Sequence, residues 1–247
     1  MRSVLAVARV TLTQQCLRKR NWTLLILLLV AFGYEFAHGE ASHLVYQNPA
    51  VVAILMAIPL SAAAGIVWDE TATGRAMIFH SHGVSRQAFV LGRVLGAIAA
   101  CWFIVAIPEA VLLGWQLASH SAQLLTALYV LTGAAIYFAY TAALLALFST
   151  FMRSWNNSAF VVVLQLSFFL MVIPLLARYG NPSGQVFRYA RLISLGPIHS
   201  MLQSASSQPP MTVDIALSLT LAAVCSSGAI LIYARRELGI YIARDDA

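Results

Sequence analysis

The stretch WDETATGRAMIFHSHGVSRQAFVLGR, residues 68–93, gathers two acids, three arginines and two histidines. The residues on both sides of it are mostly apolar, and long runs carry no charge. Only 10% of the 247 residues are charged and 60% are hydrophobic, whereas soluble domains carry about 25% charged residues. The composition therefore predicts an integral membrane protein in which this charged stretch connects two spans.

Six apolar runs approach or exceed the roughly 20 helical residues needed to cross a bilayer. The runs are continuous and do not alternate with polar residues, so they predict helices and not the strands of a barrel. The expected spans are residues 22–37, 50–68, 94–118, 122–152, 158–177 and 212–234. We expect one all-α membrane domain over residues 1–247, with residues 178–211 as an outer connection.

Residues 1–20 are too charged to form a span. Apolar or small side chains recur there near helical spacing, at Met1, Leu5, Ala8, Leu12 and Cys16. This periodicity predicts an amphipathic helix in the membrane interface, and a basic tail without fixed structure is the alternative.

Lys and Arg are distributed unequally between the two sides of the predicted bundle. Twelve of the 15 lie in the N-terminal segment, the 69–93 connection, the connection at Arg153 or the C-terminal tail. The excess of basic residues in cytoplasmic connections then places both termini and residues 69–93 in the cytoplasm. Because these residues flank apolar spans and form no solvated patch, we expect no nucleic-acid partner.

The charged connection contains features of a docking helix. Thr71 or Thr73 could cap a short helix, and acids near its start suit the helix dipole. Met77, Ile78 and Phe79 would supply apolar anchors between charged ends. From the residues alone, this stretch is either a docking helix or a basic loop that only fixes topology. The chain has no GxxxxGK[ST] motif, so we expect no P-loop ATP site of its own.

The pattern resembles the permease subunits of type-2 ABC exporters. In that family an acid-rich turn after the second span leads through a glycine and a short helix to a small-residue turn, followed by Ser-Arg and Gly-Lys pairs. The matching residues here are Glu70, Gly74, Ser85, Arg86, Gly92 and Arg93. Gly83, Arg75 and Arg93 depart from the proline, threonine and lysine that are common in the family. The segment LISLGPIHSMLQSAS, residues 192–206, is similar to the family's outer helical segment, with Pro197 as the matching residue.

The resemblance implies that residues 69–86 form a coupling helix seated on a cytoplasmic ATPase. Its implied coupling residues are Glu70, Gly74, Arg75, Met77, Ile78, Phe79, Ser85 and Arg86. Two permease copies would pair in the bacterial inner membrane, each with one ATPase subunit that binds ATP and Mg. We expect this chain to bind no cofactor and to have no catalytic site.

Three functions remain open at this point. The first is an ATP-driven permease that exports a substrate. The second is a mechanical transducer that uses the same fold to move a periplasmic partner, for example in metal-enzyme maturation, without solute export. The third is an integral membrane enzyme or assembly factor with no ATPase partner.

Pro108 and Glu109 stand inside the third predicted span. A buried acid in a span is costly and marks a functional candidate. Glu109 either lines a translocation path or is hydrogen-bonded at a helix kink. Glu35 and Asp214 fall near outer span ends, where we expect them to be solvated.

Histidines and glycines suggest two weaker features. An outer group of residues offers nitrogen and oxygen ligands at no recognised metal spacing, so we predict no metal site there. Its members are His38, Glu40, His43, His120 and His199.

We assign His80 and His82 to the ATPase-facing surface. Gly92, Gly96 and Ala100 form a small-residue ridge that packs either within the subunit or between subunits.

Overall fold

The computed structural model describes residues 1–38, 45, 46, 48–119, 123–167 and 212–235. These residues form helices and turns, with no strand among them. The helices are α1 (Arg2–Leu17), α2 (Lys19–Ala37), α3 (Pro49–Ala63), α4 (Trp68–Ala72), α5 (Arg75–Ser81), α6 (Arg86–Ala118), α7 (Leu124–Ser149), α8 (Ser154–Ser167) and α11 (Thr212–Arg235).

Five helical stretches among the described residues are long and apolar enough to cross a membrane. They are Lys19–Ala37, Ala50–Ala72, Arg86–Ala118, Leu124–Ser149 and Ile215–Arg235. The prediction of a multi-pass, all-helical membrane protein is therefore confirmed. The fifth predicted span, 158–177, is described only as far as Ser167 in α8, and the 178–211 connection lies outside the described residues.

The third predicted span, 94–118, lies within α6, which begins at Arg86. Ser85 caps it, and its hydroxyl accepts a hydrogen bond from the Ala88 amide at 3.2 Å. Hydropathy located only the apolar part of a longer helix. At 1.5 Å per residue, α6 is about 50 Å long and α2 about 28 Å, against a hydrocarbon core of ~30 Å. One portion of α6 must therefore extend beyond the core.

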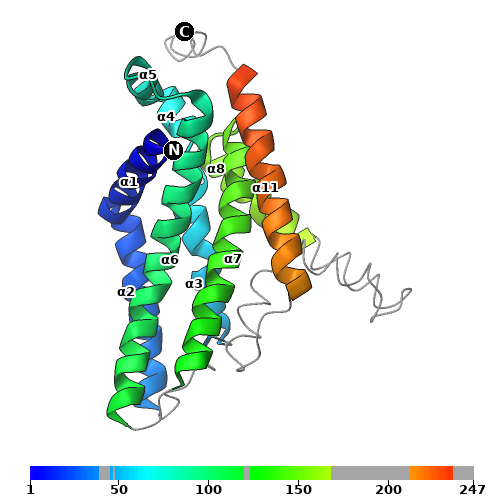
Figure 1. Cartoon of the computed structure of the whole chain (residues 1–247). Coiled ribbons are helices and arrows are strands. Elements are labelled where there is room, and N and C mark those ends of the chain that lie inside the picture. Colours follow the sequence, from blue (N-terminus) through cyan, green and yellow to red (C-terminus); the bar gives the residue numbers. More distant parts are fainter. Residues whose placement is uncertain (39–44, 47, 120–122, 168–211, 236–247) are drawn as a thin grey trace, which may run out of the picture.

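That portion of α6 packs against α1, which crosses it obliquely (Figure 1). A Cβ on Gly92 would lie 2.6 Å from Cβ of Val7, and one on Gly96 would lie 2.5 Å from the Ala8 carbonyl oxygen. The small-residue ridge therefore packs within the subunit. The predicted N-terminal helix is confirmed. Met1 and Leu5 of its predicted apolar row are exposed, whereas Val7 and Thr11 are buried.

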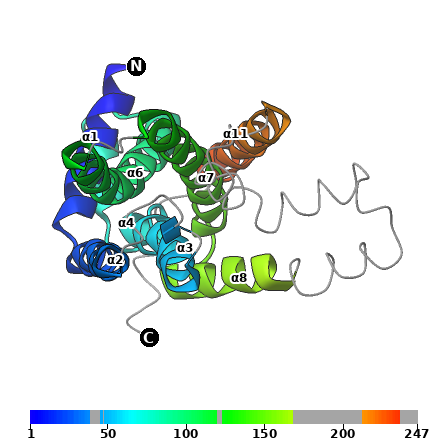
Figure 2. The ribbon, with the colours of Figure 1, turned by 90° about the horizontal axis from the view of Figure 1, so that it is seen from below.

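Two apolar clusters hold the bundle together. One lies around α5, α6 and the adjoining ends of α7 and α11, with Phe89, Leu145 and Tyr233 at its centre. The other lies farther along α2, α3, α6 and α7, with Phe32 and Phe138 fully covered. Figure 2 shows α7 between α6 and α11, with α3 beside α2 and α8 running outward. We call the end that carries α4 and α5 the α5 end.

Candidate functional site

The connection between α3 and α6 folds into two short helices at the α5 end (Figure 1). Gly74, with φ of 72°, precedes α5, and Gly83, with φ of 77°, follows it. Only glycine adopts this left-handed conformation at little cost, so the two glycines fix the turns on both sides of α5. The predicted threonine cap of α5 is wrong, because Gly74 occupies the N-cap and the Thr73 hydroxyl donates to the Asp69 carbonyl oxygen at 2.6 Å.

A buried ion pair lies directly beneath α5. The Glu70 carboxylate in α4 is 2.7 Å from Nη2 of Arg93 in α6, with the two side chains 2% and 1% exposed. Arg75, at the start of α5, is 3.4 Å from the same carboxylate oxygen and is 46% exposed. Glu70 therefore connects α4 to both α5 and α6.

Arg93 is also held by groups from other helices. Its Nη1 donates to Oε1 of Gln14 in α1 at 2.6 Å. Its guanidinium carbon lies 5.3 Å from the ring centre of Phe79 and 5.4 Å from that of Phe89. Cation–π contacts of this kind partly offset the loss of water around a buried guanidinium. Arg93 thus joins α1, α4, α5 and α6 at one point.

The side chains of α5 divide into an outward and an inward set. Met77 and Ile78 are 47% and 59% exposed, as the docking hypothesis requires. Phe79 does not share this exposure, because it packs against the core and its ring centre is 5.5 Å from that of Phe89. His82 is exposed on the same end.

His80 is not part of the outward surface to which the sequence assigned it. Its Nδ1 is 2.9 Å from the Val84 carbonyl oxygen, and its Nε2 is 3.1 Å from the hydroxyl of Tyr233 in α11. Nearby, Nη1 of Arg86 donates to the Ala234 carbonyl oxygen at 2.6 Å. These contacts tie the α5–α6 junction to the end of α11.

Two polar residues that the sequence analysis did not single out support α4 from the other side. The Ser149 hydroxyl, at the end of α7, accepts from the amides of Val67 and Trp68 at 2.9 and 3.1 Å. Asn157 in α8 donates to the carbonyl oxygens of Ala64 and Leu145 at 2.5 and 2.8 Å. They satisfy backbone groups at the turn between α3 and α4, where the helical hydrogen-bond ladder is interrupted.

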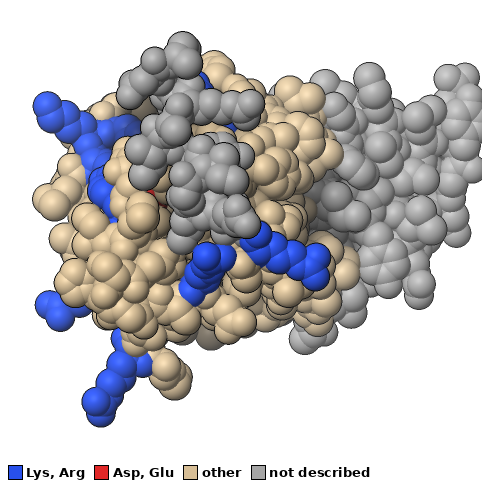
Figure 3. All heavy atoms as spheres, turned by 90° about the horizontal axis from the view of Figure 1, so that it is seen from above, with Lys and Arg blue, Asp and Glu red and all other residues tan. Residues whose placement is uncertain are grey.

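Basic side chains spread over the α5 end, as Figure 3 shows from above. The Lys and Arg residues within the described ranges belong to six places: α1, the elbow where α1 meets α2 (Arg18, Lys19 and Arg20), α5, the first turns of α6, the α7–α8 connection and the end of α11. The two acids of the charged connection, Asp69 and Glu70, are not among the exposed residues. This end therefore presents a positive surface around a small apolar projection.

A second polar group lies toward the opposite end of the bundle. The Tyr46 hydroxyl donates to Oε2 of Glu109 at 2.6 Å, and both side chains are fully covered. Burial, followed by the Glu109 carboxylate, raises the pKa of Tyr46 well above its ordinary value. Pro108 lies inside α6, which continues to Ala118. Glu109 thus binds the segment between α2 and α3.

Glu35 is buried in α2 and accepts a hydrogen bond from Nδ2 of Asn48 at 2.6 Å, so the expectation that it is solvated is wrong. In the proposed outer histidine group, His38 is exposed, and its Nδ1 is 2.8 Å from the Tyr34 carbonyl oxygen. Glu40, His43, His120 and His199 lie outside the described residues. Among the residues that the structure describes, no three His, Cys, Asp or Glu side chains form a metal-binding group.

Sequence reasoning marked Glu70 and Arg93 only as separate members of a motif. Arg93 lies seven residues after Arg86, so the spacing alone places both arginines on one face of a helix. This spacing does not indicate that Arg93 is buried or which acid it meets. No spacing rule relates Arg93 to Glu70, because a turn, a helix and a second turn separate them.

No protein-family model matches the chain, and the comparison with curated proteins likewise gave no match.

Proposed function

We propose that this chain is the membrane-spanning permease subunit of an ATP-driven exporter, and that α5 is the helix through which a separate ATPase moves it. The observation that supports this best is the division of α5 into two faces. Met77 and Ile78 are exposed, while Phe79 packs inward above Arg93. An exposed apolar pair on a firmly anchored short helix suits a docking element.

The anchoring of α5 also suits the transmission of force. A short helix passes on a partner's movement only if its base cannot yield. The Glu70–Arg93 pair fixes α4 on α6, and Arg75 of α5 contacts the same Glu70 carboxylate; removing one member of such a buried pair typically costs about 3–5 kcal/mol, because the other charge is left alone. His80 and Arg86 add hydrogen bonds to the end of α11. A displacement of α5 would therefore reach α6 and α11 together.

The proposal includes an arrangement in the membrane. The chain would have six spans, of which the fifth includes α8, and α5 and both termini would face the cytoplasm of a bacterial cell. The basic surface of the α5 end supports this orientation, because Lys and Arg are retained on the cytoplasmic side. Two copies would pair, and two ATPase subunits would bind ATP and Mg.

Copurification tests the docking role. We expect the double substitution Met77→Asp with Ile78→Asp to release a copurifying ATPase subunit, because two charges would replace the apolar anchors. The stability of the chain itself should change by less than about 0.5 kcal/mol, as is usual for exposed positions. Phe151→Asp with Trp155→Asp is the matched control, since Phe151 on the α7–α8 connection is 46% exposed and Trp155 at the start of α8 is 80% exposed.

Retention of the ATPase by the α5 variant, or equal loss in the control, would contradict the docking role. Reconstitution of the purified complex then separates the three functions. ATP-driven flux of a substrate supports export, and ATP hydrolysis that moves a periplasmic partner without flux supports mechanical transduction. A chain that purifies without any ATPase and remains active supports an enzyme or assembly factor.

A further inference from the structure

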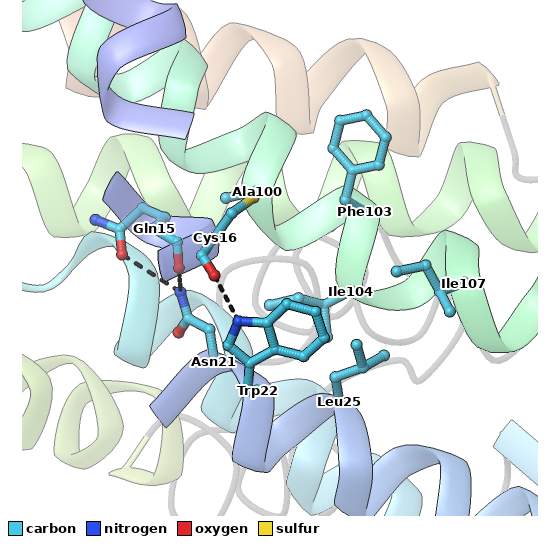
Figure 4. Close-up of a pocket in the computed structure, with 9 residues that line it drawn as sticks. All are labelled: Gln15, Cys16, Asn21, Trp22, Leu25, Ala100, Phe103, Ile104 and Ile107. Atoms are coloured by element: carbon cyan, nitrogen blue, oxygen red, sulfur yellow. Dashed lines mark hydrogen bonds between the residues drawn. The ribbon is translucent and has the colours of Figure 1, made fainter. Parts of the chain in front are cut away.

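A cavity of about 90 Å³ lies between the α1–α2 elbow and α6 (Figure 4). Its walls are Trp22 and Leu25 from α2 and Ala100, Phe103, Ile104 and Ile107 from α6, and Gln15, Cys16 and Asn21 close the elbow end. Trp22, Phe103 and Ile107 are 54%, 46% and 42% exposed, so the cavity opens as a groove on the outer surface of the bundle.

We propose that this groove binds an anionic phospholipid, with its headgroup at the basic elbow and part of an acyl chain between α2 and α6. The proposal is independent of the proposed exporter function and concerns a different part of the chain from α5. It rests on the position of the groove along the membrane normal, the apolar character of its walls and the positive charge near one end.

The groove lies where a lipid changes from headgroup to hydrocarbon. From Ala100 to the end of α6 at Ala118 is about 27 Å, which matches both the ~28 Å of α2 and the ~30 Å core. The elbow beside Ala100 therefore marks the boundary of the hydrocarbon. Trp22 fits this depth, because indole side chains are enriched at membrane interfaces. From Ala100 to Ile107 the groove runs about 10 Å inward, within the ~15 Å of one leaflet.

The groove walls offer little to a polar ligand. The Trp22 indole nitrogen donates to the Cys16 carbonyl oxygen at 2.7 Å, and Nδ2 of Asn21 donates to the Gln15 carbonyl oxygen at 2.7 Å. Oδ1 of Asn21 accepts from the Ser61 hydroxyl at 2.5 Å. These polar groups at the elbow are thus used within the protein, and Figure 4 shows the bonds of Asn21 to Gln15 and of Trp22 to Cys16. The remaining lining is hydrocarbon, which suits an acyl chain.

Three consecutive cations, Arg18, Lys19 and Arg20, lie in the chain between Cys16 and Asn21, which line the elbow end of the groove, although none of the three lines the cavity itself. Lys19 and Arg20 are exposed, and Arg18 is half-buried. Asp69 interacts electrostatically with both arginines, but it supplies one negative charge against three positive ones. A basic pocket beside a span attracts anionic headgroups by about 1 kcal/mol per Lys or Arg, which is about fivefold in affinity for each.

The same charges argue against a second copy as the occupant. A two-fold pair formed on this face would bring identical surface patches together, including both basic elbows. An anionic phospholipid instead neutralises the elbow and fills the groove at the same time.

Native mass spectrometry of the full chain tests the proposal, after solubilisation from vesicles of equimolar phosphatidylglycerol and phosphatidylcholine with identical acyl chains. We expect phosphatidylglycerol to be retained preferentially. Lys19→Gln with Arg20→Gln should reduce that preference about fivefold per charge, or about 25-fold together. The control Arg2→Gln with Arg9→Gln removes equal charge from exposed positions of α1 and should leave the preference unchanged.

A second pair of variants tests the groove itself. Ile107→Trp should fill it and lower the retention of both lipids, whereas Val111→Trp, one turn farther along α6 and outside the lining, should not. Equal retention of the two lipids by the wild type would overturn the proposal. It would also be overturned if Arg2→Gln with Arg9→Gln reduced the lipid preference as much as the elbow variant, or if Val111→Trp lowered lipid retention as much as Ile107→Trp. Dissociation of a dimer by Ile107→Trp without loss of lipid would also overturn it, since that result would make the groove an interface between copies.

Discussion

The carboxylate of Glu70 and the guanidinium of Arg93 lie 2.7 Å apart beneath α5, in an environment that leaves neither side chain more than 2% exposed. Such a pair gains little over an apolar replacement, since the two charges lose their water on folding. Its effect is on geometry. It holds the short α4 against the long α6, and Arg75 at the start of the outward-facing α5 contacts the same carboxylate.

Breaking this pair should be costly, whereas trimming the neighbouring exposed cation should not. We expect Glu70→Ala or Arg93→Ala to lower the free energy of unfolding by about 3–5 kcal/mol, because each leaves a buried charge alone. The control Arg75→Ala should cost less than about 1 kcal/mol, because Arg75 is half-exposed and 3.4 Å from the carboxylate. Chemical unfolding in detergent measures all three. Equal effects of Arg75→Ala and Arg93→Ala would mean that the pair is solvated.

The packing of α1 on α6 predicts different outcomes at two glycines of the same helix. Gly96→Val should lower stability by more than about 2 kcal/mol, because the new side chain meets the backbone of α1. Gly114→Val should be tolerated, since nothing lies within 4 Å of a Cβ there. Both changes alter helix propensity equally, so the difference in unfolding free energy reports packing alone. The same stability for both variants would show that α1 does not lie on α6.

The Glu109–Tyr46 hydrogen bond predicts a distinction between polar and apolar replacements. Glu109→Gln should stay within about 1 kcal/mol of the wild type, because an amide oxygen can accept from the Tyr46 hydroxyl. Glu109→Leu should cost about 1–3 kcal/mol, because it leaves that hydroxyl buried without its acceptor. A transport or ATPase assay of the stable Glu109→Gln variant then separates the two roles considered for this acid. We expect unchanged activity, and a stable but inactive variant would instead indicate a translocation path.

The orientation in the membrane predicts which surface positions react from outside the cell. In a Cys16→Ser background, we expect Ser119→Cys, at the far end of α6, to react with a membrane-impermeant maleimide on intact cells. Ser81→Cys, at the end of α5, should react only after the membrane is opened. Both serines are exposed, and the remaining native cysteines, Cys101 and Cys225, are buried. Reaction of Ser81→Cys on intact cells would reverse the orientation.

The sequence alone determined the class of the protein and most of its helices. Apolar runs of helical length leave few alternatives in a bilayer. The positive φ of Gly74 and Gly83, which fixes the turns around α5, is seen only in the structure. The sequence also identified Met77 and Ile78, since an apolar pair inside a charged connection stands out from its neighbours.

Only the tertiary structure decided which ionisable residues meet. Glu70 and Arg93 are brought together by two turns and a helix, and His80 reaches Tyr233 across 153 positions of the chain. Phe79 is turned inward because Arg93 and Phe89 form the surface on which α5 rests. Local sequence sets hydropathy and backbone preference, which act over a few residues. The choice of partner for a buried charge depends on where separate helices cross, and no short-range pattern in the sequence encodes that.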